Sequence, residues 1–193
     1  DADYHLVSFS GIGVISRYVE PESDEPLTDV LMPDLYPWTD SVLCRRKGWA
    51  SERWNFQSFC PQVIVVNLGT NDGSYTRGIR QREETFCRRY IRFLEEVHRR
   101  NPDAEIICTL GVMDQQLVPA VTEAVRALSA ESIPVRMHLE QALCLENGQR
   151  SGENRRQEES LPRMEMTGCD GHPSAEAQRE MAEDLKSFIC ANT

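Results

Sequence analysis

The sequence predicts a three-layer α/β domain with a mostly parallel sheet, on three observations. Residues 62–68, "QVIVVNL", form a continuous apolar run of the kind that is buried on both faces in a parallel sheet. Residues 82–100 follow, with apolar side chains at helical spacing. Apolar strand-like runs and helical segments then alternate along the chain, which is the pattern of parallel strands joined by helices.

The first part of the chain is less regular. Residues 4–9, "YHLVSF", predict a short strand, and "SGIG" at residues 10–13 breaks it. Residues 18–59 are rich in Pro, Asp and Trp and show no convincing period. Long segments of this kind are unusual inside a compact domain and often cover a functional face.

After residue 68 the elements are clearer. The helix of residues 82–100 ends at Asn101-Pro102, because a residue before proline disfavours helical backbone. The next expected elements are a strand at 104–111, a helix at 117–131, a strand at 133–139, an exposed loop at 146–162 and a helix at 172–189. Ser174 stands at the N-cap position of that last helix.

Composition and charge exclude several classes of function. A chain of 193 residues suits one domain, and its net charge of −10 argues against a protein that binds nucleic-acid phosphates. No run approaches the roughly 20 apolar residues that span a bilayer, so no membrane partner is expected. The seven cysteines are scattered and include no CxxC pair, so we expect no metal site, no other cofactor and no disulfide framework. Buried thiols favour a reducing compartment, cytoplasmic rather than secreted.

The segment "CDGHPS", residues 169–174, is a candidate for acid–base chemistry. A general-base histidine needs an acceptor on one ring nitrogen, which leaves the other nitrogen for a nucleophile. Asp170 and His172 can supply both parts from one loop. The alternative is a surface turn that caps the following helix.

Two further segments carry hydrogen-bond donors at strand ends. In "GTND", residues 69–72, Asn71 offers amide donors that suit a developing oxyanion, although an Asn-Asp-Gly turn is an equally good explanation. In "SGIG", Gly11 lets a backbone N–H approach a ligand closely, although glycines at strand ends are common.

Together and in this order, the three segments resemble the blocks of the SGNH (GDSL-type) hydrolase family. "VSFSGIG", "VIVVNLGTNDGSY" and "CDGHPS" are similar to its glycine, asparagine and histidine blocks. The text around them, "LMPDLYPWTD" and "RWNFQSFCPQ", resembles the acetylxylan-esterase-type branch, carbohydrate esterase family two. The resemblance covers nearly the whole chain and implies a flavodoxin-like α/β/α sandwich.

The resemblance also implies a role for each site residue. His172 would be the general base and Asp170 its orienting partner, although some members of this branch use a backbone carbonyl instead of the acid. Gly11 and Asn71 would be oxyanion donors. The implied function is a serine-type ester hydrolase that removes a small acyl group such as acetyl from a carbohydrate or a similar alcohol.

One block of the family is missing from this sequence. The family's Gly-Asp-Ser stretch supplies the nucleophilic serine, and no Gly-Asp-Ser occurs in these 193 residues. In the family's order that block lies upstream of "SGIG", at the end of a central first strand. We therefore expect residues 1–193 to be the C-terminal portion of one SGNH hydrolase domain.

Three accounts of the missing serine are open. In the first, an upstream segment or companion subunit carries Gly-Asp-Ser and the central strand. In the second, Ser8 or Ser10 substitutes as nucleophile. In the third, the fold has lost catalysis and serves as a carbohydrate-binding or scaffolding module.

The aromatic residues of the second loop are the remaining candidates. Trp38 and Tyr36 could stack on a sugar ring, although covering the sheet is the commoner task of such side chains. Met113, after the strand at 104–111, could line the same pocket. The expected ligand is an acylated carbohydrate or a small ester.

Overall fold

The computed structural model describes residues 2–111, 113–139 and 172–192. These residues fall into two compact units, which are described separately. The first unit comprises the described residues up to Leu110 together with Asp114–Met137. The second comprises the described residues of Gly111–Met113 and His138–Thr193.

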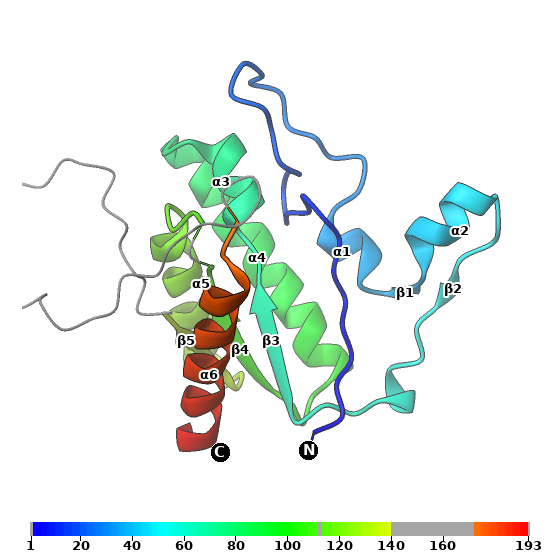
Figure 1. Ribbon diagram of the computed structural model, residues 1–193, viewed down its shortest axis with the longest axis vertical. Coiled ribbons are helices and arrows are strands. Elements are labelled where there is room, and N and C mark those ends of the chain that lie inside the picture. The colour runs from blue at the N-terminus through cyan, green and yellow to red at the C-terminus, as the bar shows by residue number, and fades with distance from the viewer. Residues whose placement is uncertain (1, 112, 140–171, 193) are drawn as a thin grey trace, which may run out of the picture. The chain divides into compact units, whose positions relative to one another are not determined.

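A three-stranded sheet forms the centre of the α/β fold (Figure 1). Its strands are β3 (Val63–Asn67), β4 (Glu105–Thr109) and β5 (Val135–His138), in the spatial order β3-β4-β5. β3 and β4 pair in parallel, with Val63 opposite Glu105. The helices α4 (Arg80–Arg100) and α5 (Val118–Ala130) lie between these strands along the chain. The predicted alternation of strands and helices is therefore confirmed.

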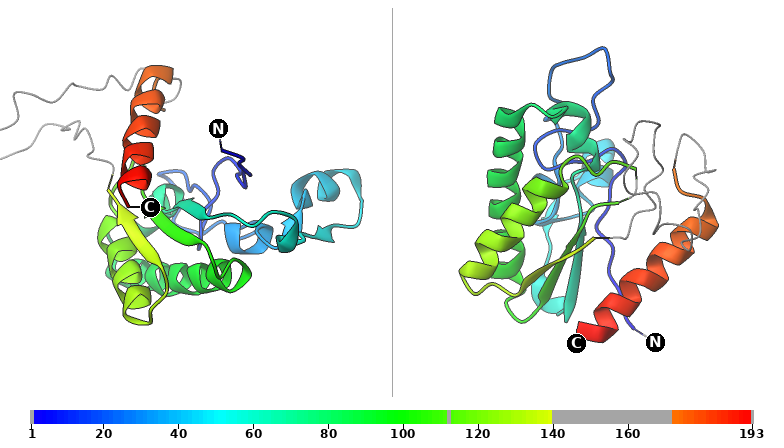
Figure 2. Two further views of the ribbon diagram at one scale, coloured as in Figure 1. Left: turned by 90° about the horizontal axis from the view of Figure 1, so that it is seen from below. Right: turned by 90° about the vertical axis from the view of Figure 1, so that its left-hand side faces the viewer.

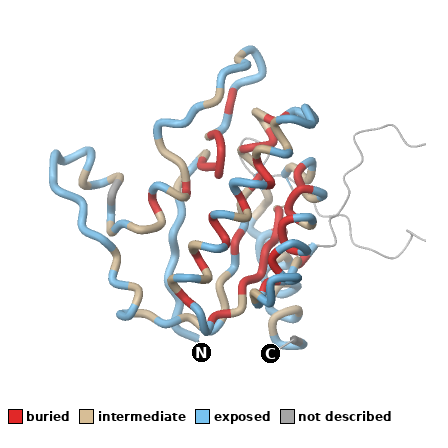
Figure 3. Tube along the Cα trace, turned by 180° about the vertical axis from the view of Figure 1, so that it is seen from behind, coloured by how far each residue is buried: buried red, intermediate tan, exposed pale blue. Residues whose placement is uncertain are grey.

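The helices α4 and α5 cover one face of this sheet (Figure 2). Apolar side chains from both helices and from the strands form the core there, and Figure 3 shows their buried positions. The largest fully buried side chains on these elements are Phe86, Tyr90, Leu94, Val97, Ile106, Ile107, Val121 and Leu128. Each large apolar side chain that is removed from water contributes about 1.5–3 kcal/mol to folding.

The burial of β3 differs from the sequence-based prediction. β3 is the outer strand of the sheet, only Val66 on it is buried, and Val65 is 42% exposed. The expected burial on both faces is therefore wrong for β3, whereas four of the five β4 residues are buried. β3 is less covered because, among the described residues, no strand pairs with its outer edge.

The predicted strand at residues 4–9 is also wrong. Those residues form no strand, and Tyr4 and Leu6 are 81% and 74% exposed. A strand is stabilised by backbone hydrogen bonds to a neighbouring strand. In the described part of the chain this segment has no neighbouring strand. Its β-prone sequence alone is therefore not enough to form a strand.

The irregular segment of residues 18–59 contains only short elements. They are α1 (Met32–Leu35), β1 (Trp38–Thr39), α2 (Ser41–Lys47), β2 (Glu52–Arg53) and the 3-10 turn η1 (Phe56–Ser58). β1 and β2 form a two-stranded antiparallel pair. The sequence predicted neither the short helices α1 and α2 nor the helix α3 (Thr70–Thr76), which directly follows β3.

The second unit contains the helix α6 (Ala175–Asn192). Its predicted N-cap is confirmed, because the hydroxyl of Ser174 accepts a hydrogen bond from the N–H of Ala177 at 3.1 Å. The expected loop at 146–162 lies outside the described residues. No helix in the described part of the chain is long and apolar enough to span a bilayer.

Candidate functional site

The carboxyl end of β3 carries the first predicted oxyanion donor. Asn71 lies in the first turn of α3 and is half-buried. Its side-chain amide donates to the carbonyl of Ile12 at 2.7 Å. A primary amide carries two N–H donors, so this bond leaves one donor of Asn71 for a ligand. Asn71 therefore lies beside the segment that contains the second predicted donor, Gly11.

Asp72, the next residue, binds the same segment through its carboxylate. One of its oxygens accepts the backbone N–H groups of Val14, Ile15 and Ser16 at 2.9, 2.7 and 3.1 Å. The other oxygen lies 3.0 Å from the N–H of Val14. Successive N–H groups that converge in this way form a concave anion-binding nest, and here the anion is a side chain of the protein itself.

Burial makes this carboxylate unusual. Asp72 is fully buried, and loss of hydration raises its pKa from 3.8 to about 6, although the N–H groups of Ile15, Val14 and Ser16 act in the opposite direction. Asp72 is therefore ionised at neutral pH and protonated in mild acid. Its state decides whether three N–H donors face a carboxylate or a neutral acid.

Two glycines allow this close approach. A Cβ atom on Gly13 would lie 1.9 Å from the carbonyl oxygen of Ser16 and 2.6 Å from a carboxylate oxygen of Asp72. No side chain fits there. Gly11 has a φ of +72°, a region that other residues rarely adopt, and its N–H has no acceptor among the residues that the structure describes.

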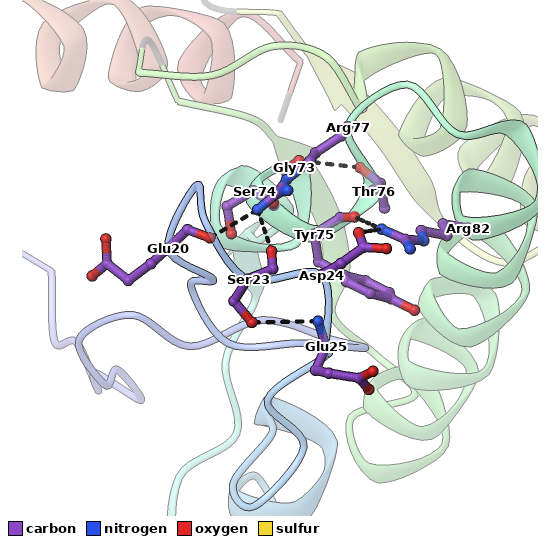
Figure 4. A network of polar contacts seen from close by, with 10 residues as sticks. All are labelled: Glu20, Ser23, Asp24, Glu25, Gly73, Ser74, Tyr75, Thr76, Arg77 and Arg82. Carbon is purple, nitrogen blue, oxygen red and sulfur yellow. Dashed lines mark hydrogen bonds and ion pairs between the residues drawn. The ribbon is translucent and has the colours of Figure 1, made fainter.

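The chain that follows this segment is fastened to α3 and α4 by two arginines (Figure 4). Arg77 donates to the carbonyls of Glu20 and Ser23 at 2.9 and 2.7 Å. Arg82 forms an ion pair with Asp24 at 2.8 Å, and its hydrogen bond to Asp24 lowers the pKa of that carboxyl. The segment from Gly11 to Asp24 is thus attached at both ends.

The predicted base is in the other unit. His172 is exposed and lies just before α6, while Asp170 lies outside the described residues. Met113, which is 45% exposed, also belongs to the second unit. Gly11 and Asn71 are brought together by the structure, whereas the convergence of His172 with them stays a prediction.

The two aromatic candidates have other contacts. The hydroxyl of Tyr36 accepts from Asn101 at 2.8 Å, and its ring meets Phe93 edge-on at 5.6 Å. Phe93 lies in the C-terminal half of α4, and Asn101 is its C-cap. Asn71 comes before the N-terminal end of the same helix in the chain, and the helix is about 30 Å long. These contacts favour a packing role for Tyr36, and its substrate-binding role stays a prediction.

Trp38 is 36% exposed and stacks under the guanidinium of Arg53, which lies 4.6 Å from the centre of its ring. The two residues are opposite each other in the β1–β2 pair. This contact does not show whether the exposed part of the ring binds a sugar. The assignment of Trp38 to substrate binding therefore also stays a prediction.

Asp72 is a residue of the candidate site that the sequence analysis did not identify. It stands inside the quoted "GTND" segment, but its partners are 56–58 residues away along the chain. The available signal was a carboxylate directly after a strand together with a second glycine in "SGIG". Neither shows which backbone the carboxylate binds.

Comparisons with known proteins find that the chain is similar to carbohydrate esterases. The chain is 33% identical over 113 residues to the cellulase/esterase CelE of Acetivibrio thermocellus, covering 58% of this chain and 12% of that protein. It is 26% identical over 199 aligned residues to an acetylxylan esterase/glucomannan deacetylase of Cellvibrio japonicus, covering 98% of this chain and 46% of the relative.

Solved structures give the same result. The fold matches a family two carbohydrate esterase from Clostridium thermocellum in complex with cellohexaose, with a TM-score of 0.63 and 28% identity. That match covers 93% of this chain and 46% of the other. No protein-family model matches the chain. The chain thus spans less than half the length of the relatives described here.

Proposed function

We propose that this chain forms part of a serine-type ester hydrolase of the SGNH type, because it is similar to an acetylxylan esterase/glucomannan deacetylase and to a family two carbohydrate esterase. The proposed reaction removes a small acyl group, acetyl, from a carbohydrate or a similar alcohol. One observation carries this proposal. The amide of Asn71, at the carboxyl end of β3, binds the carbonyl of Ile12 at 2.7 Å, and Ile12 directly follows Gly11 in the chain.

The chemistry follows the triad scheme of serine hydrolases. A serine hydroxyl attacks the acyl carbonyl as its proton passes to His172, and Asp170 orients the imidazole. The remaining donor of Asn71 and the N–H of Gly11 bind the oxyanion, each contributing roughly 3 kcal/mol to the transition state. His172 then protonates the leaving alcohol. Water hydrolyses the acyl-serine, releases the carboxylic acid and restores the serine.

The nucleophile is the part of the proposal that needs a second polypeptide segment. We assign the serine to an upstream segment or companion subunit that carries Gly-Asp-Ser and adds a strand beside β3. Three features support this assignment: β3 lies at the sheet edge, Val65 is 42% exposed, and residues 4–9 lack a strand partner among the described residues. Unpaired edges of this kind are normally covered.

A serine-reactive probe tests the proposal. The protein is isolated from its native cells, treated with a tagged fluorophosphonate, and its intact mass is measured together with that of any accompanying polypeptide. We expect one adduct, on a serine in a Gly-Asp-Ser stretch upstream of residue 1. Heat-denatured protein serves as the control and takes up no label.

Other labelling patterns separate the alternatives. An adduct on Ser8 or Ser10 supports the esterase and contradicts the companion segment. A preparation that binds cellohexaose but takes up no label contradicts the esterase and supports a carbohydrate-binding module. That result would agree with the bound cellohexaose in the Clostridium thermocellum neighbour.

A further inference from the structure

Two neighbouring side chains bind opposite kinds of backbone group in one segment. Asn71 donates to the carbonyl of Ile12, and Asp72 accepts the N–H groups of Val14, Ile15 and Ser16. The residue between those partners, Gly13, has no room for a side chain. Residues 12–16 are therefore fixed against the first turn of α3 from both directions.

This attachment determines where Gly11 lies. Gly11 precedes Ile12 directly, and its positive φ of +72° turns the chain at that point. The backbone N–H of Gly11 therefore takes its position from the residues that Asp72 and Asn71 hold. A shift of the nest around Asp72 would move that N–H relative to the amide of Asn71, since both are anchored through the same five residues.

The protonated form of Asp72 stabilises the fold more than its ionised form does. An acid whose pKa is higher in the folded state than in the unfolded state favours folding in its protonated form. The stability that it contributes is present below pH 4 and is lost as the pH rises to about 6, the pKa of Asp72. Above that pH the buried carboxylate is ionised, and the folded state is less stable than it would be with the protonated acid. This favours a role for the carboxylate that needs its charge.

We propose that Asp72 is a positioning residue: its ionised carboxylate orders residues 12–16 and thereby aims the N–H of Gly11 and the amide of Asn71 at one point. This inference rests on the proposed esterase function, which assigns the two donors. Asp72 itself does not touch the substrate. It acts on the reaction through the backbone that it holds.

Three other titratable side chains lie in this region, those of Tyr90, Cys108 and Asp114. The neighbouring Tyr90 on α4 and Cys108 on β4 have pKa values raised by burial, that of Cys108 to about 12, so both stay protonated from pH 5 to 8. The carboxylate of Asp114 lies against the backbone of Gly73, one residue after Asp72. Asp114 is not substituted in any of the variants below.

Amide hydrogen exchange tests the inference without any enzyme assay. Asp72→Asn keeps the size of the side chain but places an amide N–H₂ against the three backbone donors. We expect protection of the amides of Val14, Ile15 and Ser16 to fall at least about tenfold in this variant at pH 7.5, while the amides of α4 stay protected. The matched control is Asp103→Asn, at an exposed position, and it should change the protection of neither residues 14–16 nor α4.

A pH series distinguishes positioning by the charge from simple packing. In the wild type, protection of the same three amides should fall between pH 7.5 and pH 5, as Asp72 takes up a proton. In Asp72→Asn it should stay low and independent of pH over this range. Wild-type protection that does not change with pH, or an unaltered Asp72→Asn, overturns the inference.

Kinetics on 4-nitrophenyl acetate then link the segment to catalysis, using the native protein with its accompanying polypeptide. Misplaced donors should lower kcat at least about tenfold in Asp72→Asn and leave KM within about twofold, because they act on the transition state. An unchanged kcat overturns the positioning role. An inactive wild type overturns the proposed esterase instead, and in that case the exchange experiment still decides the role of Asp72.

Discussion

At the scale of single residues, the apolar strand β3 is followed by an amide and a carboxylate that both serve a distant segment. Turn formation alone would satisfy Asn71 and Asp72 locally, within a few residues. Instead both side chains reach backbone groups 56–59 residues away. Each buried N–H that lost its partner there would destabilise the fold by about 1–3 kcal/mol. The pair is therefore part of a long-range contact, as a site at a strand end requires.

The role of Asn71 gives the most direct prediction at this scale. Asn71→Ala removes one oxyanion donor, so kcat on an acetyl ester should fall about a hundredfold or more in the complete protein. Steady-state kinetics measure this, and Asn55→Ala, which removes an exposed cap of η1, is the control. A variant of normal kcat would remove Asn71 from the mechanism.

At the scale of elements, the sequence predicts those whose pattern is local. β3, β4, β5, α4, α5 and α6 all occur near the positions that apolar runs, helical spacing and the Ser174 N-cap predict. α3 was missed because seven residues are too few to show a helical period and its Asn-Asp-Gly reads as a turn. The strand at 4–9 failed because pairing depends on a neighbour, which no local pattern contains.

The same contrast applies to the candidate site. Gly11 and Asn71 could be named from their motifs, because both stand at the ends of strand-like runs. Asp72 could not, since its role arises only when residues 14–16 fold against α3. Motif spacing identifies donors and bases, but it does not show which backbone an acid holds.

The open edge of β3 gives a prediction for an element. If an upstream strand pairs there, hydrogen exchange at the outer amides of β3 and in residues 4–9 should slow when the companion segment is present. Exchange followed by mass spectrometry compares the chain with and without that segment. β4, which is already buried and paired, serves as the internal control. Equal exchange at β3 in both samples would contradict an added strand.

At the scale of the whole molecule, the proposed site combines three sources. We propose Gly11 and Asn71 as the oxyanion donors and His172 as the base, and we assign the serine to an upstream segment or companion subunit. The described relatives are longer than the chain, which spans 46% of the Cellvibrio japonicus protein. The central claim is therefore one of convergence: groups from these sources meet around one serine.

A crystal structure of the native protein carrying a fluorophosphonate adduct tests that convergence most directly. We expect a phosphoryl oxygen about 3 Å from both the amide nitrogen of Asn71 and the backbone nitrogen of Gly11, with His172 in hydrogen-bond reach of the serine. An adduct whose oxygen contacts neither donor, or a His172 that faces away from the modified serine, would contradict it.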